Sequence, residues 1–192
     1  MMIKENVHPT STQSLIIQAI VSTTFLAELQ NSNFLDSEYF KNMHFDNESY
    51  KAILKQSGIG NPAVLQFALY SYLVIPKELL SREEYEPITF LHKNIDNYIS
   101  TIVEKETYST YSKENSVKTI KYCNHIRNAI AHSRTVYEIE NNISYVTFID
   151  ERQNDKCKCK CKCKIKMKTH YVGEIIGRLS DALTFYFIET LN

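Results

Sequence analysis

The sequence predicts an all-α helical bundle with a small antiparallel β-hairpin or meander inserted before the last helix. Apolar residues recur every three or four positions from the N-terminal region to residue 132 and again after residue 170, which is the spacing of amphipathic helices. Between these regions, at about residues 135–168, the spacing changes to two in segments rich in β-branched and aromatic residues. The chain shows no internal repeat and no linker, so we expect one domain over residues 1–192.

Five helices are expected in the N-terminal half of the chain. The first follows a helix-start signal at residues 9–12. Asn61-Pro62 is typical of a cap followed by proline at the first helical position. The helix that starts there is expected to bend at Pro76. Pro87 is expected to begin the fifth helix. The five helices cover residues 15–29, 37–42, 48–56, 63–79 and 87–103.

The second half of the chain begins with a polar connection at residues 108–113. Asn141-Asn142 suits a tight turn between two strands, and residues 152–155 form a second polar turn before a strand in which lysine alternates with cysteine. The expected elements are a helix over residues 114–132, strands over 135–140, 143–149 and 156–168, and a final helix over 170–191.

Composition excludes several protein classes. With 9 Phe, 13 Tyr, 4 Gly and 4 Pro in 192 residues, the chain is neither disordered nor collagen-like, and it needs no metal or disulfide merely to fold. The 22 basic and 22 acidic side chains cancel, but residues 156–168 hold seven lysines and no acid, so an acidic body carries a cationic strand. Neutral net charge therefore does not exclude an RNA partner, and any binding is expected to be local and salt-sensitive.

No targeting signal is visible in the sequence. The apolar stretch of residues 15–29 is interrupted by polar residues such as Gln18 and Glu28 and has no basic region before it, so we expect neither an export signal nor a membrane span. The odd count of five cysteines favours reduced thiols. These features predict a cytoplasmic protein without a membrane partner.

The helix expected at residues 114–132 has two chemically different faces. Its apolar side consists of Tyr122, Cys123, Ile126, Ala129 and Ile130. Its polar side consists of Lys121, His125, Asn128 and His132, with Arg127 beside them. Simple solvation in a monomer would also explain a polar face, and the spacing from arginine to histidine is by itself a weak motif.

The string from Ile126 to His132, Ile-Arg-Asn-Ala-Ile-Ala-His, resembles the signature of the HEPN superfamily. That signature is an arginine, a polar residue, three further residues and a histidine near the end of a bundle helix, and the order of elements in this chain is also similar. The resemblance implies a metal-independent endoribonuclease without a cofactor, acting as a homodimer in which the motif helices of two protomers form one cleft. It also implies a toxin or antiphage-defence setting, with an antitoxin or defence protein as partner.

The residue types suit RNA cleavage by the substrate's own 2′-hydroxyl. Histidine is the side chain whose ordinary pKa lies nearest neutrality, so His132 is expected to transfer a proton. The guanidinium of Arg127 is expected to stabilise the negative charge of the transition state, with Asn128 in support. Since DNA lacks the attacking hydroxyl, this mechanism predicts RNA products that end in a 2′,3′-cyclic phosphate. The structural alternative pairs Arg127 with a carboxylate and places His132 at a helix C-terminus, where the helix dipole favours it.

One position departs from a HEPN toxin subgroup, in which a tyrosine two residues after the motif histidine is nucleotidylated by an antitoxin enzyme. This chain has Arg134 at that position, which puts this form of neutralisation in doubt. Arg134 instead adds a cation near the motif. Together with Lys121 and His125 it is a candidate for RNA binding.

Residues 156–168 alternate so that a strand carries seven lysines on one face and cysteines, Ile165 and Met167 on the other. Neighbouring ammonium groups about 7 Å apart lie within the screening length of about 8 Å and repel one another unless countercharges approach. RNA phosphates would supply these charges to Lys158, Lys160, Lys162 and Lys164. The alternatives are a solvated edge strand, a repeat without a specific task, and a thiolate metal site. Because Cys-x-Cys on a strand is too widely spaced for one tetrahedral ion, we expect no metal.

A function of another class stays open beside the nuclease. In it, the chain is a non-catalytic HEPN module that binds RNA or a partner protein through the same cleft. The two functions differ in whether substitution of Arg127 or His132 abolishes RNA cleavage.

Overall fold

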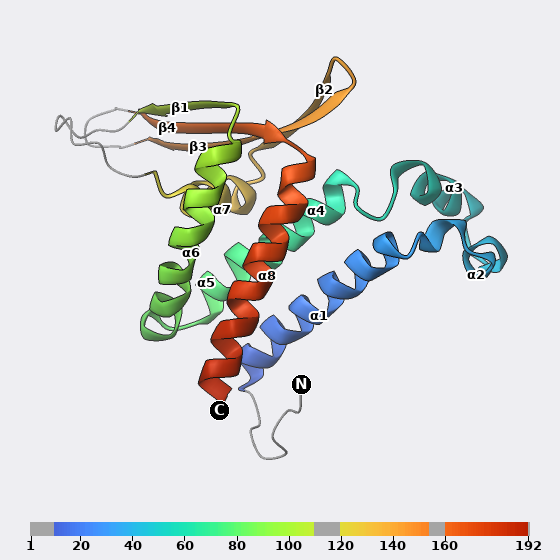
Figure 1. Cartoon of the computed structure of the whole chain (residues 1–192), viewed down its shortest axis with the longest axis horizontal. Coiled ribbons are helices and arrows are strands. Elements are labelled where there is room, and N and C mark those ends of the chain that lie inside the picture. The colour runs from blue at the N-terminus through green and yellow to red at the C-terminus, as the bar shows by residue number, and fades with distance from the viewer. Residues whose placement is uncertain (1–9, 110–119, 154–159, 192) are drawn as a thin grey trace.

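The computed structural model describes residues 10–109, 120–153 and 160–191 (Figure 1). An antiparallel sheet lies across one end of the long helices α6 and α8, and α2 and α3 lie at the far end of α1. The helical elements are α1 (Ser11–Asn31), η1 (Phe34–Asp36), α2 (Glu38–Asn42), α3 (Glu48–Ser57), α4 (Pro62–Leu69), η2 (Tyr70–Val74), α5 (Ile75–Leu79), α6 (Arg82–Ile102), α7 (Tyr122–Ala131) and α8 (His170–Leu191). The strands are β1 (Lys105–Ser109), β2 (Thr135–Glu140), β3 (Ile143–Gln153) and β4 (Lys160–Lys168).

Capping boxes set where α1 and α6 begin. The hydroxyl of Thr10 accepts a hydrogen bond from the Gln13 amide, and the Gln13 side chain accepts one from the Thr10 amide. Ser81 and Glu84 exchange the same pair of bonds at the start of α6. Pro87 therefore lies inside α6, and the prediction that it begins the helix was wrong. The helix begins earlier because the capping box satisfies backbone N–H groups of its first turn. Pro87 then removes only one backbone hydrogen bond from the helix.

The helix predicted over residues 63–79 forms as a continuous helical run, α4–η2–α5. Asn61 caps it by accepting hydrogen bonds from the amides of Ala63 and Val64. The distortion expected at Pro76 takes the form of a π-helical turn, η2, which ends two residues before it. Proline has no N–H and its ring crowds the carbonyl four residues earlier, so the α-helical bonding breaks at this turn.

The sheet has four antiparallel strands in the order β1-β4-β3-β2. The predicted hairpin of β2 and β3 is present, with Asn141 and Asn142 at positive φ in its turn. The expectation of an all-α chain with a single inserted meander was too simple, because β1 comes before α7 and pairs with β4. Residues 105–107 were predicted as neither strand nor helix, and residues 110–119, including the predicted helix start at 114, lie outside the described residues.

The core lies between the inner face of the sheet and the helices. The predicted alternation of the two faces is confirmed for residues 162–168 of β4, where Cys163, Ile165 and Met167 are buried. The predicted apolar stripe of α8 is also buried. Its buried members are Val172, Ile175, Leu179, Leu183, Tyr186 and Phe187. This core fixes α7 between the sheet, α6 and the η2 turn, which positions the motif helix.

Within the described residues, no single helix has both the length and the apolar composition needed to cross a membrane. Glu48–Ser57 and Pro62–Leu79 meet that criterion only as a pair, and the pair is bent by 80°.

Candidate functional site

The motif helix α7 is fixed at both ends by contacts outside the helix. At its start, the buried carboxylate of Asp96 on α6 accepts a hydrogen bond of 2.7 Å from the backbone N–H of Cys123. Burial raises the pKa of Asp96, and this hydrogen bond partly opposes the rise. At its end, Ser133 adopts φ 53° and the Arg134 amide donates to the carbonyl of Ala129. The helix α7 begins at Tyr122, and Asp96 supplies an acceptor for its first turn.

A hydrogen-bonded chain of four side chains joins the polar face of α7 to β3. Nδ1 of His125 lies 2.8 Å from Oδ2 of Asp150, and the Asn128 amide donates to the same oxygen at 2.9 Å. The side-chain oxygen of Asn128 then accepts from Nε and Nη2 of Arg127, at 3.2 Å and 2.8 Å. Asn128 thus orients the guanidinium of Arg127 and the carboxylate of Asp150.

Arg127 reaches from this network toward two buried aromatic side chains of α6. Burial raises the pKa of Tyr85, while the charge and a hydrogen bond of Arg127 oppose the rise. Burial and then the charge of Arg127 lower the pKa of His92 to about 4. His92 is therefore neutral at pH 7, and its ring nitrogens have no hydrogen-bond partner among the described residues. Arg127 is consequently the cation of this cluster.

His132 stands apart from these side chains. It is the C-terminal cap of α7, its side chain is exposed, and the described residues offer that side chain no hydrogen bond or ion pair. Its backbone N–H bonds to the carbonyl of Asn128, as helix geometry requires. The structure therefore brings Arg127, Asn128 and His125 together and leaves His132 at the rim of the site.

The outer candidates Lys121 and Arg134 also lie near the surface. Lys121 is exposed at the start of α7. Arg134 donates a hydrogen bond of 2.6 Å from Nη1 to the carbonyl of Glu151, so its guanidinium is attached to β3. Neither residue is hydrogen-bonded to Arg127 within the described part of the chain.

Sequence reasoning missed Asp150, Asp96 and His92, although each left a signal. Asp150 shares its side of β3 with the buried Val146 and Phe148, and the period of two places it on that inner face. His92 and Asp96 lie on the buried stripe of α6, where a titratable group is unusual. A search for polar residues on apolar stripes would have found all three.

The lysine face of β4 meets glutamates of the protein itself. Lys166 pairs with Glu140 at 2.7 Å and Glu138 at 3.4 Å, and the hydrogen bond to Glu140 raises its pKa. Lys168 pairs with Glu104 at 3.4 Å and Lys162 pairs with Glu151. Lys164 on the same face has no ion pair with a described residue. Glutamates of the protein itself thus supply countercharges that were predicted for these lysines. Less uncompensated positive charge is therefore available to RNA phosphates than the sequence suggested.

The two remaining RNA-binding candidates of this segment are not placed. Lys158 lies outside the described residues, and the side chain of Lys160 is not described. Cys157 and Cys159 also lie outside the described residues. Burial raises the pKa of the Cys163 thiol to about 12, so it is protonated rather than a thiolate ligand. Among the described residues, no group of three His, Cys, Asp or Glu side chains is arranged to hold a metal ion.

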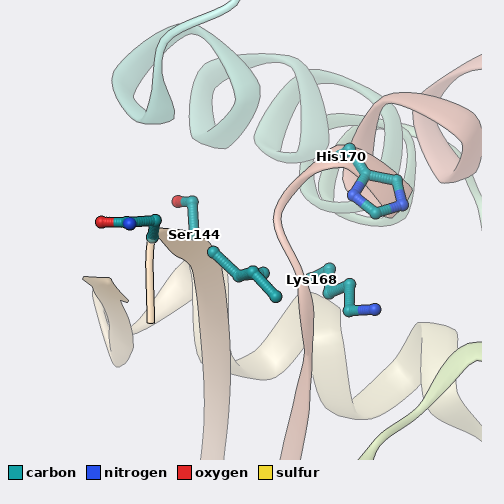
Figure 2. Close-up of a pocket in the computed structure, with 5 residues that line it drawn as sticks. Ser144, Lys168 and His170 are labelled. Carbon is teal, nitrogen blue, oxygen red and sulfur yellow. The ribbon is translucent and has the colours of Figure 1, made fainter. Parts of the chain in front are cut away.

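A surface pocket lies at another part of the sheet, where β3 and β4 meet the start of α8. Figure 2 shows Ser144, Lys168 and His170 around it. Ser144 is six residues before Asp150, which is about 20 Å along an extended strand. The pocket is therefore separate from the site on α7, and its lysine is paired with Glu104.

Comparison with known proteins agrees with the resemblance in the motif. A family model described as HEPN pEK499 p136 matches residues 2–190. No significant match to a curated protein or to a solved structure was found. The matched region includes α7, the whole sheet and all of α8 except its last residue.

Proposed function

The chain belongs to the HEPN pEK499 p136 family, and we propose that it is a metal-independent endoribonuclease that cleaves RNA by attack of the substrate's 2′-hydroxyl. The observation that carries this proposal is the fixed guanidinium of Arg127. It is held by Asn128 on the helix that ends at the exposed His132. A preorganised cation and a solvent-accessible imidazole on the same helix are the minimum that this reaction needs.

Arg127 has the role of stabilising the transition state. A guanidinium carries five N–H groups, and Asn128 accepts two of them. Other N–H groups can face a phosphate whose oxygens gain negative charge as the 2′-oxygen attacks. Because Asn128 already fixes the orientation of the plane, little reorganisation is needed when substrate binds.

His132 has the role of proton transfer, and the proposed active form is a homodimer. In this arrangement two α7 helices face each other across a two-fold axis, so that both protomers line one RNA cleft. The exposed position of His132 supports this arrangement, since a side chain at the helix end is available to a cleft between protomers.

The proposed setting is a toxin or antiphage-defence system acting in the cytoplasm. Its partner would be an antitoxin or defence protein that does not rely on the tyrosine of the nucleotidylated toxins, because Arg134 stands at that position. Toxicity on expression that His132→Ala abolishes is the cellular result expected.

The direct test compares cleavage rates of structured and single-stranded RNA in the presence of a chelator. His132→Ala and Arg127→Ala are each expected to lose about 10²-fold or more relative to wild type. His44→Ala and Arg82→Ala are matched controls, because both residues are exposed and neither belongs to α7 or its network. Equal cleavage by wild type, His132→Ala and Arg127→Ala would refute the proposed nuclease mechanism.

The alternative is a non-catalytic HEPN module that binds RNA or a partner protein. The observation favouring it is that Arg127 and His132 share no hydrogen bond within one chain, whereas Arg127 is engaged by Asn128 and Tyr85. This function predicts salt-sensitive RNA binding without cleavage, and binding that survives His132→Ala.

A further inference from the structure

We propose that His125, held by Asp150, is a second proton-transfer residue of the nuclease and acts as its general acid. The inference rests on the proposed function, because it assigns a further step of the same reaction. In that reaction the 2′-oxygen forms a bond to phosphorus, the bond from phosphorus to the 5′-oxygen breaks, and the 2′-hydroxyl proton passes to a base. The departing 5′-oxygen keeps the electron pair of the broken bond and must receive a proton from an acid.

Two groups are needed because the two oxygens lie on opposite sides of phosphorus. The base removes a proton where the new bond forms, and the acid supplies one where the old bond breaks. His132, exposed at the end of α7, suits the side of the attacking hydroxyl. The acid must lie on the other side of the guanidinium that holds the phosphate.

His125 has the required position on the motif helix. It is seven residues before His132, so the two side chains share a face about two turns apart, near 10 Å at 1.5 Å per residue. Arg127 and Asn128 lie between them in the helix. One fifth of the His125 side-chain surface is exposed, so the ring is neither fully buried nor fully solvated.

Asp150 gives His125 the orientation of a catalytic histidine. Its carboxylate lies 2.8 Å from Nδ1, and a carboxylate bonded to Nδ1 fixes the orientation and the tautomer of an imidazole. Asp150 also accepts from Asn128, which in turn accepts from Arg127. The acid and the cation are therefore held by one network, with Asp150 as a positioning residue.

Charged groups lie near His125 on β3, α6 and α7. Asp150 on β3 compensates the charge of imidazolium, and the charge of His125 acts on Asp96 of α6. Lys121, one turn earlier on α7, lowers the pKa of Asp96 in the same direction as His125 does. Burial raises the pKa of the Cys163 thiol on β4 to about 12, so this thiol is neutral at pH 7.

The test uses two RNA substrates that differ in one atom, with oxygen or sulfur at the 5′ position of the scissile bond. A thiolate leaves without protonation, so sulfur removes the need for an acid but not for a base. His125→Asn keeps an amide donor for Asp150 and cannot carry the proton, and His125→Ala is a second variant should the first misfold. Both are expected to lose about 10²- to 10⁴-fold on the oxygen substrate and to approach wild-type rates on the sulfur substrate.

The other variants make the outcome specific. His132→Ala is expected to lose activity on both substrates, and Asp150→Asn to lose it partly on oxygen and regain it on sulfur. Equal losses on the two substrates, or no loss, for both His125 variants would overturn the role of His125 alone. A wild-type protein that cuts neither substrate would overturn the proposed nuclease together with this inference.

Discussion

Protonation of His92 is expected to destabilise the folded protein as the pH falls from 6.5 to 4. The imidazole is 4% exposed and its pKa is lowered to about 4 by burial and by the charge of Arg127. Over this interval the unfolded chain binds a proton that the folded chain does not, so the free energy of unfolding decreases as the pH decreases. A pKa of about 4 in the folded chain against 6.5 in the unfolded chain corresponds to about 3 kcal/mol, or about 1.4 kcal/mol per pH unit.

Asp96 acts in the opposite direction and must be separated from His92. Its pKa is raised by burial, so the folded chain keeps a proton at pH values where the unfolded chain has lost it. Its contribution to stability is therefore present at low pH and is lost as the pH rises through the raised value. The pH dependence of wild type alone mixes the two groups, whereas the difference between wild type and a His92 variant isolates one.

The assay is urea unfolding of wild type and His92→Leu at pH values from 4.5 to 7.5. Leucine fills similar space without unpartnered nitrogens, so at pH 7.5 the variant is expected to be as stable as wild type or more stable. Towards pH 4.5 the variant is expected to gain on wild type by about 1.4 kcal/mol per unit. His92→Gln serves as a polar control with no titrating group. Parallel curves for wild type and both variants would refute the reasoning, as would an NMR titration of His92 near pH 6.5 in the folded protein.

Three further predictions concern packing, capping and charge. Met167→Ala removes a fully buried side chain under the sheet and is expected to cost about 2–5 kcal/mol in denaturant unfolding, and a cost below 1 kcal/mol would contradict its place in the core. Ser81→Ala breaks the capping box of α6 and is expected to cost about 1 kcal/mol, unlike the exposed control Ser49→Ala, which retains the Asn47 cap. If RNA binds the outer face of the sheet, Lys164→Ala is expected to lower the slope of log K for RNA binding against log salt by about 0.7. Lys166→Ala is expected to change this slope less, because Lys166 is paired with Glu138 and Glu140. A larger change for Lys166→Ala than for Lys164→Ala would show that the internal ion pairs do not screen the lysines.

Local patterns predicted most of the helices and both faces of β4. The run from Pro62 to Leu79 and the helix α8 carry long apolar patterns, and the first of them has a clear start signal in Asn61-Pro62. Such elements are set mainly by neighbours within a few residues. The strand β1 was missed because its five residues show little apolar alternation, and its partner β4 comes more than 50 residues later. Pairing over such a separation leaves no trace in a local window.

Only the residues of the candidate site that lie on α7 were predicted from the sequence. Arg127, Asn128 and His125 do share a connected group, but Asp150, which connects them, belongs to a strand that a helical wheel does not include. The glutamates that pair with the lysines of β4 belong to β2, β3 and the residue before β1. Their proximity follows from strand register, which the sequence of β4 alone does not contain.

The most direct test of the proposed function is the chemistry of the RNA ends that the purified protein makes in the presence of a chelator. A defined RNA is incubated with wild type and with His132→Ala, and the products are identified by mass spectrometry. The account predicts fragments with a 2′,3′-cyclic phosphate and a 5′-hydroxyl from wild type, and intact RNA from the variant. Fragments with a 5′-phosphate, cleavage of an all-2′-deoxy substrate, or the same products from His132→Ala would contradict it.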